Sequence, residues 1–221
     1  KTLFDAAIAN AKKRNQLQVA GESNAVVNLK HAVLDKVVLS KVRDRLGGRL
    51  AFAFSGGAAI STEVMNFLDA VGIVVFEGYG LSETSPIASM NHPEARKVGS
   101  VGQALPGVEI FIDTDAVGGV MGEEGEILIK GPNVMQGYHG LPDKTAEVLR
   151  DDGAFRTGDL GHKDDQGFVY ITGRASDMYI SGGSNIYPRE IEEFLFTHPS
   201  IEQSAVVGVP DLLVLWCKCL L

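Results

Sequence analysis

Cysteine is scarce in this chain, which has only Cys217 and Cys219 among 221 residues. The pair lies near the end of the sequence and lacks the four-ligand pattern of a zinc site. The five histidines are scattered without metal-ligand spacing, and no G-x-S-x-G segment predicts a serine hydrolase. With so few cysteines, a reducing, cytoplasmic location is expected.

Long apolar runs and an excess of positive charge are lacking as well. No run approaches the ~18 apolar residues of a membrane span, and residues 1–14 are not a signal peptide. The net charge of −8, with no basic stripe interleaved with aromatic residues, argues against a nucleic-acid partner. We therefore expect a globular, loop-rich protein without a transmembrane segment, in which local dipoles and a metal hold anionic substrates.

The first part of the chain alternates between helical and extended patterns. Apolar residues recur at helical spacing up to Gly47-Gly48, a glycine pair typical of a helix end. Apolar and β-branched runs then alternate with one more helical pattern. The predicted elements are helices at 3–15, 26–46 and 61–70 and strands at 49–54 and 71–75.

Beyond about residue 98 the pattern changes to short strands separated by glycine-rich turns. This change predicts a β-rich subdomain, for which a small barrel is one arrangement. One helix interrupts it, with Pro142 near its first turn. The predicted elements are strands at 108–113, 126–130 and 168–172 and the helix at 141–149.

After Gly173 the composition becomes polar and small, which predicts a domain boundary. A helix at 188–196 and a strand at 201–209 are predicted beyond it. The fold class is therefore mixed α/β. We expect the end of a large domain at residues 1–173, with the β-rich subdomain at 98–173, and the start of a small α+β domain at 174–221.

The stretch from residue 76 to 86, F-E-G-Y-G-L-S-E-T-S-P, carries the densest chemistry. It follows the apolar run 71–75, so we expect the chain to pass at Phe76 from a buried strand into a loop, where ligands sit in α/β proteins. Gly78 and Gly80 flank Tyr79, so a flat group such as a purine can lie close to the backbone.

Ser82 and Glu83 follow in the same stretch. A hydroxyl beside a hard carboxylate suits a phosphate oxygen and its Mg²⁺. An ordinary tight loop after a core strand explains the same residues equally well. A G-x-G-x-x-G dinucleotide fingerprint is excluded, because Glu83 stands where the third glycine would be.

Two more positions are candidates for ligand binding. Asp159, between Gly158 and Leu160 in F-R-T-G-D-L, can accept from two vicinal hydroxyls such as those of a ribose. A turn aspartate explains this hexamer slightly better when it is taken alone. Gly56-Gly57 permits tight passage of the backbone beside a ligand, and a plain strand-turn-helix connection explains it equally well.

Five segments together resemble the adenylate-forming superfamily, which includes acyl-CoA synthetases, luciferases and the adenylation domains of peptide synthetases. They occur in the family's order between about Ser55 and Glu192, at similar spacing. The segments are S-G-G-A, E-G-Y-G-L-S-E-T, G-E-I-L-I-K-G-P-N-V-M-Q-G-Y, F-R-T-G-D-L and G-R-A-S-D-M-Y-I-S-G-G-S-N-I-Y-P-R-E-I-E.

The resemblance implies that a carboxylic acid is activated with ATP and Mg²⁺ to an acyl adenylate, and that many such enzymes then transfer the acyl group to CoA. It implies that Tyr79 packs on adenine and that Asp159 and Arg174 hold the ribose. It also implies that Ser82 contacts phosphate and Glu83 binds Mg²⁺, which makes them the catalytic pair. The implied cofactor-binding residues are Gly57, Glu77, Gly78, Tyr79, Gly80, Ser82, Asp159 and Arg174.

Two glycine loops have further implied roles. The loop of Gly57 borders the acyl channel, and the loop of Gly182 and Gly183 faces the site when the small domain turns for thioester formation. The segment ending in R-L-A-F-A-F-S-G-G-A resembles bacterial medium- and long-chain fatty acyl-CoA synthetases, which favours a fatty acid as the acid substrate. Aryl acid-CoA ligases and fatty acyl-AMP ligases share similar motifs.

The sequence departs from the family in three places. The phosphate loop S-G-T-T-G-x-P-K-G and the C-terminal lysine of the family do not occur in it, and residues 212–221 read L-L-V-L-W-C-K-C-L-L instead of a polar segment. We therefore expect a chain that begins partway through the large domain and does not make acyl-CoA by itself. A catalytically dead nucleotide-binding module is the alternative from another class.

Overall fold

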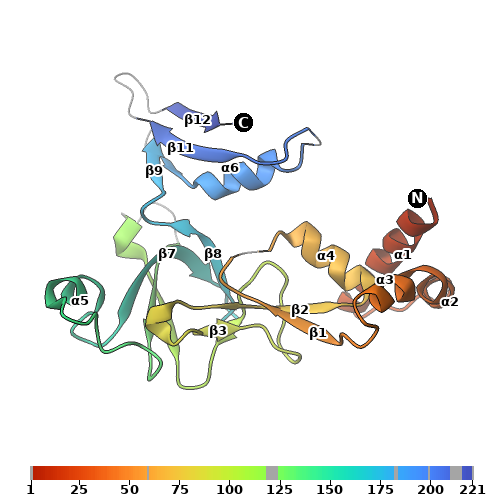
Figure 1. The fold of residues 1–221 in the computed structure, drawn as a ribbon, viewed down its shortest axis with the longest axis horizontal. Helices are drawn as coiled ribbons and strands as arrows, with labels where there is room; N and C mark the ends of the chain where they lie inside the picture. The colour runs from red at the N-terminus through yellow and green to blue at the C-terminus, as the bar shows by residue number, and fades with distance from the viewer. Residues whose placement is uncertain are drawn as a thin grey trace. The chain divides into compact units, whose positions relative to one another are not determined.

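The structure, a computed structural model, describes residues 2–58, 60–117, 124–181, 184–198, 200–209 and 216–220 (Figure 1). The chain divides into two compact units, residues 1–78 with 92–99, and residues 79–91 with 100–221. The boundary expected after Gly173 stays a prediction. Helices alternate with strands in the first part of the chain, and antiparallel strands follow in the later part. The fold is therefore mixed α/β, which is the predicted class.

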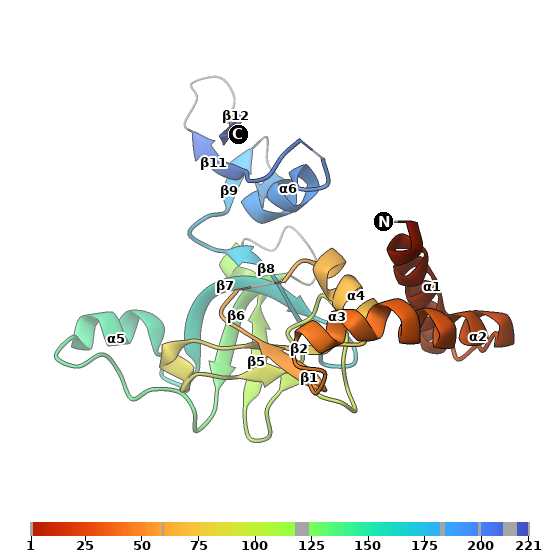
Figure 2. The same cartoon turned by 45° about the vertical axis from the view of Figure 1, so that its right-hand side comes forward.

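Helices dominate the first unit. α1 (Thr2–Val19) contacts α2 (Ala25–Leu34) and α4 (Thr62–Val71). α2 continues through a π-helical turn, η1 (Asp35–Leu39), into α3 (Ser40–Arg45), and Figure 2 shows this run as one continuous helix. Both helices predicted ahead of the glycine pair are thus confirmed, and the π turn is an addition that the apolar spacing did not predict.

Local chemistry fixes both ends of α4. Ser61 caps the start, because its hydroxyl accepts from the Val64 N–H at 3.3 Å. Gly72 ends the helix in the left-handed conformation, with φ 89°, which a glycine adopts without a Cβ clash. Val71 is therefore the last residue of α4, and the prediction that a strand starts there is wrong.

β2 (Val74–Tyr79) pairs in parallel with β1 (Phe52–Ser55), from Phe52 opposite Val74 to Ser55 opposite Glu77. The prediction that a loop starts at Phe76 is wrong, since the strand continues to Tyr79. Gly78 hid the end of the strand from sequence patterns, because glycine is uncommon inside strands. Gly56, just after β1, comes close to this end of β2. A Cβ added at Gly56 would lie 3.3 Å from the Gly78 carbonyl oxygen.

An antiparallel sheet forms the centre of the second unit, and Figure 2 shows its strands side by side. The predicted strands of the β-rich region are confirmed, and the described strands form an open sheet instead of a closed barrel. Its buried core includes Ile127, Ile129 and Val169, together with Tyr79. The order is β5 (Glu109–Asp113), β6 (Gly125–Lys130), β7 (Phe155–Lys163) and β8 (Val169–Arg174).

Shorter elements complete the second unit. The predicted helix with proline in its first turn is confirmed as α5 (Pro142–Val148), and the predicted helix at 188–196 as α6 (Pro188–Leu195). Figure 1 shows α6 beside β11 (Ala205–Val209), which it contacts. Two-residue or three-residue strands escaped prediction: β3 (Ser89–Met90), β4 (Gln103–Ala104), β9 (Tyr179–Ser181) and β10 (Ser184–Ile186). β12 (Trp216–Leu220) pairs with β11.

In the described part of the chain, no helix combines the length and the apolar character that crossing a membrane requires.

Candidate functional site

Three of the predicted site residues meet in the second unit. Tyr79 is the last residue of β2, Asp159 lies in β7, and Arg174 lies opposite Asp159 at the end of β8. The Tyr79 hydroxyl donates to Asp159 Oδ2 at 2.6 Å, and Arg174 Nε lies 3.1 Å from Asp159 Oδ1. The carboxylate of Asp159 is thus held between a phenol and a guanidinium that come from different strands.

Burial sets the electrostatics of this trio. The Asp159 side chain is only 6% exposed, whereas that of Arg174 is 64% exposed. Burial of the phenol, together with the negative charge of Asp159, raises the pKa of Tyr79, so Tyr79 remains a hydrogen-bond donor at neutral pH. Each carboxylate oxygen has two lone pairs and therefore keeps an acceptor position beside its present partner. The trio can accept two further hydroxyl donors.

The backbone around Asp159 is fastened by neighbouring side chains. Glu126 Oε1 accepts from the Gly158 N–H at 3.1 Å, and Thr157 Oγ1 accepts from the Asp159 N–H at 3.0 Å. Thr157 in turn donates to the Ile127 carbonyl at 2.7 Å. Asp159 itself pairs with Arg174 across β7 and β8, so it belongs to a paired strand. Its interpretation as a turn aspartate is wrong. Turn-like residues on either side had concealed that strand.

Ser82 and Glu83 lie in a single turn of 3-10 helix, η2 (Ser82–Thr84). Ser82 is exposed and Glu83 is half-buried. Glu83 Oε1 accepts from the Tyr138 hydroxyl at 2.9 Å, and this hydrogen bond raises the pKa of Tyr138. The main-chain carbonyl of Glu83 accepts from the Met135 N–H at 2.8 Å.

The loop after Gly80 is fixed by two further contacts. A Cβ at Gly80 would lie 2.0 Å from the Pro86 carbonyl oxygen, so only glycine fits at this close approach. Asn133 Nδ2 donates to the carbonyls of Thr84 at 3.1 Å and Ile87 at 3.0 Å. These contacts hold the segment that carries Ser82 and Glu83.

Sequence reasoning missed the part played by Asn133, Met135 and Tyr138. All three belong to the segment G-P-N-V-M-Q-G-Y, part of one of the five segments that resemble the family. The family resemblance of this segment was the one sequence signal that its residues contribute to the site. Its contacts with η2 join residues about fifty positions apart, which no local pattern reveals.

The other predicted residues belong to the first unit or fall outside the described part of the chain. Gly57, Glu77 and Gly78 belong to the first unit. Gly57 is exposed just after β1, whereas Glu77 is buried and its Oε1 accepts from the Ile60 N–H at 3.2 Å. Gly182 and Gly183 fall outside the described residues, and their role stays a prediction.

Glu83 is the candidate for holding a metal. The described residues contain no group of three or more histidines, cysteines or carboxylates that gathers around one point. Mg²⁺ does not need such a group, because it is often bound by one or two carboxylates together with substrate phosphates and water. Glu83 fits this mode, since its Oε1 accepts from Tyr138 and its second oxygen keeps its lone pairs for a metal.

A comparison with protein families finds a match to "AMP-binding enzyme" over residues 2–139. The chain belongs to this AMP-binding enzyme family. Among its relatives is the long-chain-fatty-acid–CoA ligase of Bacillus subtilis (strain 168), 43% identical over 187 residues, which cover 83% of this chain and 32% of the relative. The 2-succinylbenzoate–CoA ligase of Geobacillus sp. (strain WCH70) is 36% identical over 204 residues, which cover 91% of this chain and 41% of the relative.

Solved structures of AMP-binding enzymes share the fold. O-succinylbenzoate coenzyme A synthetase from Bacillus subtilis, in complex with ATP and magnesium ion, matches with a TM-score of 0.66 and 38% identity, over 73% of this chain and 34% of that one. The chain spans about 32% to 41% of the length of the curated relatives named above.

Proposed function

We propose that the full-length protein is an ATP-dependent acid–CoA ligase, which forms an acyl adenylate and then transfers the acyl group to the thiol of CoA. The buried carboxylate of Asp159 between Tyr79 and Arg174 is the observation that carries this proposal. A carboxylate buried this deeply and still able to accept two hydroxyls suits a vicinal diol, and a ribose supplies one. Membership of the AMP-binding family supports a nucleotide as the source of that diol.

Five of the predicted residues then have a physical role in the proposed site. The rigid ring of Tyr79 offers a face to adenine, and Asp159 accepts from the ribose hydroxyls with Arg174 beside it. The exposed hydroxyl of Ser82 is free to donate to a phosphate oxygen. Glu83 holds magnesium, which when bound neutralises negative charge on the phosphates of ATP.

The chemistry explains why such a site is needed. A carboxylate is a poor electrophile, whereas its mixed anhydride with AMP carries a good leaving group. Negative charge builds up at the α-phosphate while the acid attacks, so the protein contributes mainly by positioning the reactants and stabilising that charge. The hydrogen bonds from Asn133 fix the loop from Gly80 to Ile87 and so hold Ser82 and Glu83 in position.

A medium- or long-chain fatty acid is the proposed acid substrate. The identity of 43% to a long-chain-fatty-acid–CoA ligase supports it. The identity of 36% to a 2-succinylbenzoate–CoA ligase favours an aromatic acid as the second candidate.

The test is to incubate the full-length protein with ATP, Mg²⁺ and CoA and with one acid at a time, and to identify the products by mass spectrometry. The acids are octanoate, palmitate, 2-succinylbenzoate and benzoate. The proposal predicts AMP together with an octanoyl or palmitoyl thioester of CoA. Acyl adenylate without thioester would mark an acyl-AMP ligase instead. Nucleotide binding without turnover of any acid would mark a nucleotide-binding module and contradict the proposal.

A further inference from the structure

The side chain of Tyr138 contacts Glu83, the candidate metal-binding residue. Its segment is joined to the loop that carries Glu83 at three points. Asn133 Nδ2 donates to the main-chain carbonyls of Thr84 and Ile87, and the Met135 N–H donates to the main-chain carbonyl of Glu83. The third joins the Tyr138 hydroxyl to Oε1 of the Glu83 carboxylate at 2.9 Å. Tyr138 is thus the member of this segment that touches the ionisable group itself.

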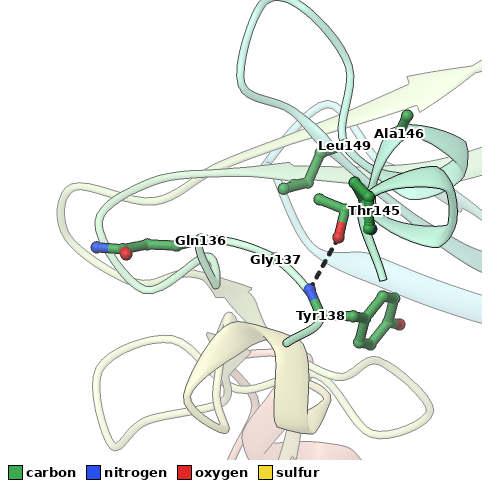
Figure 3. A pocket seen from close by; sticks show the side chains of 7 residues that line it. Gln136, Gly137, Tyr138, Thr145, Ala146 and Leu149 are labelled. Atoms are coloured by element: carbon green, nitrogen blue, oxygen red, sulfur yellow. Dashed lines mark hydrogen bonds between the residues drawn. The ribbon is translucent and has the colours of Figure 1, made fainter. Parts of the chain in front are cut away.

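The position of Tyr138 is determined from its other side by α5. Thr145 Oγ1 accepts from the Tyr138 N–H at 2.9 Å, drawn as a dashed line in Figure 3, and donates to the Leu141 carbonyl at 2.9 Å. A Cβ added at Gly137 would lie 2.8 Å from Thr145 Cγ2, so the chain passes tightly along this side chain. The contacts run in series from Thr145 through Tyr138 to Glu83.

The hydrogen bond restricts a carboxylate that would otherwise rotate. Glu83 is half-buried on a single helical turn, and its other polar contact in the described structure runs through the main chain, to the Met135 N–H. When Oε1 is fixed by Tyr138, the direction of Oε2 is fixed as well. Groups that orient a metal-binding carboxylate in this way typically change metal affinity or activity by 10–100-fold when they are removed.

We propose that Tyr138 is a positioning residue, which holds Glu83 Oε1 so that Oε2 faces the divalent cation of the nucleotide, and that Thr145 keeps Tyr138 in place. This rests on the proposed function, since it requires a metal–ATP complex at Glu83. In this contact the Tyr138 hydroxyl donates and Glu83 Oε1 accepts.

The test compares four single variants of the full-length protein. Tyr138→Phe removes the hydroxyl and keeps the ring. Tyr170→Phe is the matched control, because the Tyr170 hydroxyl also donates to a carboxylate oxygen, Asp164 Oδ2, at 3.3 Å and away from Glu83. Thr145→Val removes the hydroxyl that accepts from the Tyr138 N–H. Thr145→Ser keeps this hydroxyl and is the conservative variant.

Binding of Mn²⁺ in the presence of a non-hydrolysable ATP analogue, measured by electron paramagnetic resonance, gives a readout independent of turnover. We expect Tyr138→Phe to raise the Mn²⁺ dissociation constant about tenfold. Affinity for the analogue in EDTA and the melting temperature should be unchanged. Thr145→Val should shift Mn²⁺ binding in the same direction, Thr145→Ser should restore it, and Tyr170→Phe should leave it as in the wild type.

A double variant tells whether Tyr138 acts through Glu83. In a Glu83→Gln background, the further change Tyr138→Phe should have no additional effect on Mn²⁺ binding. An equal loss in both backgrounds, an equal loss of metal-free analogue binding, or unchanged Mn²⁺ binding in Tyr138→Phe would overturn the inference. Failure of the wild type to bind the analogue would overturn the proposed function and this inference together, so the two failures are told apart by the wild-type measurement.

Discussion

Replacing Tyr79 with phenylalanine tests how the buried trio is held together. The substitution removes one oxygen, the donor of the 2.6 Å hydrogen bond to Asp159 Oδ2. Hydrogen bonds to charged groups contribute about 1.5–3 kcal/mol to stability, and the buried position of Asp159 places this bond toward the middle of that range. A loss of ~2 kcal/mol corresponds to a fall in melting temperature of about 4–8 °C for a chain of this size.

The assay is urea unfolding of the wild type and the variant at pH 7, with Tyr170→Phe as the control. The Tyr170 hydroxyl donates over 3.3 Å to Asp164 from a half-buried side chain, so we expect that variant to lose less than about 1 kcal/mol. The phenyl ring of Tyr79→Phe keeps its face, so nucleotide binding should survive the substitution. Equal losses in the two variants would refute the claim that the buried carboxylate depends on Tyr79.

Alkaline pH provides a second arm of the same experiment. The folded-state pKa of Tyr79 is raised above its ordinary value of about 10, first by burial and then by Asp159. Above pH 10 the unfolded chain therefore releases a proton that the folded chain retains, and stability falls as the pH rises. The contribution is fully present below pH 10. The stability difference between wild type and Tyr79→Phe should thus shrink above pH 10, and a constant difference would contradict the assignment.

Three other substitutions have defined outcomes. Gly80→Ala should lower the free energy of unfolding by about 3 kcal/mol or more in urea, because its Cβ would lie 2.0 Å from the Pro86 carbonyl oxygen. Gly173→Ala should lower it by less than half as much, because the nearest atom to its Cβ lies 3.7 Å away. Asp35→Asn should flatten the acid-side loss of stability, because an arginine hydrogen bond lowers the pKa of Asp35 and its contribution is lost as the pH falls below about 4. We expect a hinge at Ser176, just after the predicted domain boundary, because a small residue there can absorb a change in φ and ψ. Ser176→Pro should therefore impair thioester formation more than adenylation, measured as separate half-reactions, because proline fixes φ. Equal losses in the two glycine variants, the same acid-side slope in Asp35→Asn as in the wild type, or equal losses in the two half-reactions would contradict the respective prediction.

The sequence predicted most of the regular elements, because apolar spacing and end signals act locally. α4 shows this well, since Ser61 and Gly72 mark its ends by direct contacts with its own backbone. The extent of β2 could not be predicted, because Glu77 and Gly78 resemble a loop in sequence, and only the pairing with β1 as far as Glu77 shows that the strand continues. Pairing between strands depends on residues distant in sequence, which no short window contains.

The candidate site was predicted in its residue types and only partly in its contacts. The meeting of Tyr79 with Asp159 joins positions 80 residues apart, and it followed from the family resemblance instead of from either segment alone. The local prediction for Asp159, a turn, was wrong because the flanking glycine and threonine also suit an irregular strand. Tyr138 was missed altogether, since nothing near it in the sequence indicates that its hydroxyl reaches Glu83.

Acid-dependent exchange of labelled pyrophosphate into ATP tests the central claim most directly, in the full-length protein and its Glu83→Gln variant. The amide keeps the shape of the side chain and removes the charge that a magnesium ion requires. Glu147→Gln is the matched control, because Glu147 is exposed and pairs with Lys144 on the surface of α5. The account predicts exchange in the wild type and the control and a loss of roughly a hundredfold in Glu83→Gln. Near-wild-type exchange in Glu83→Gln would contradict it.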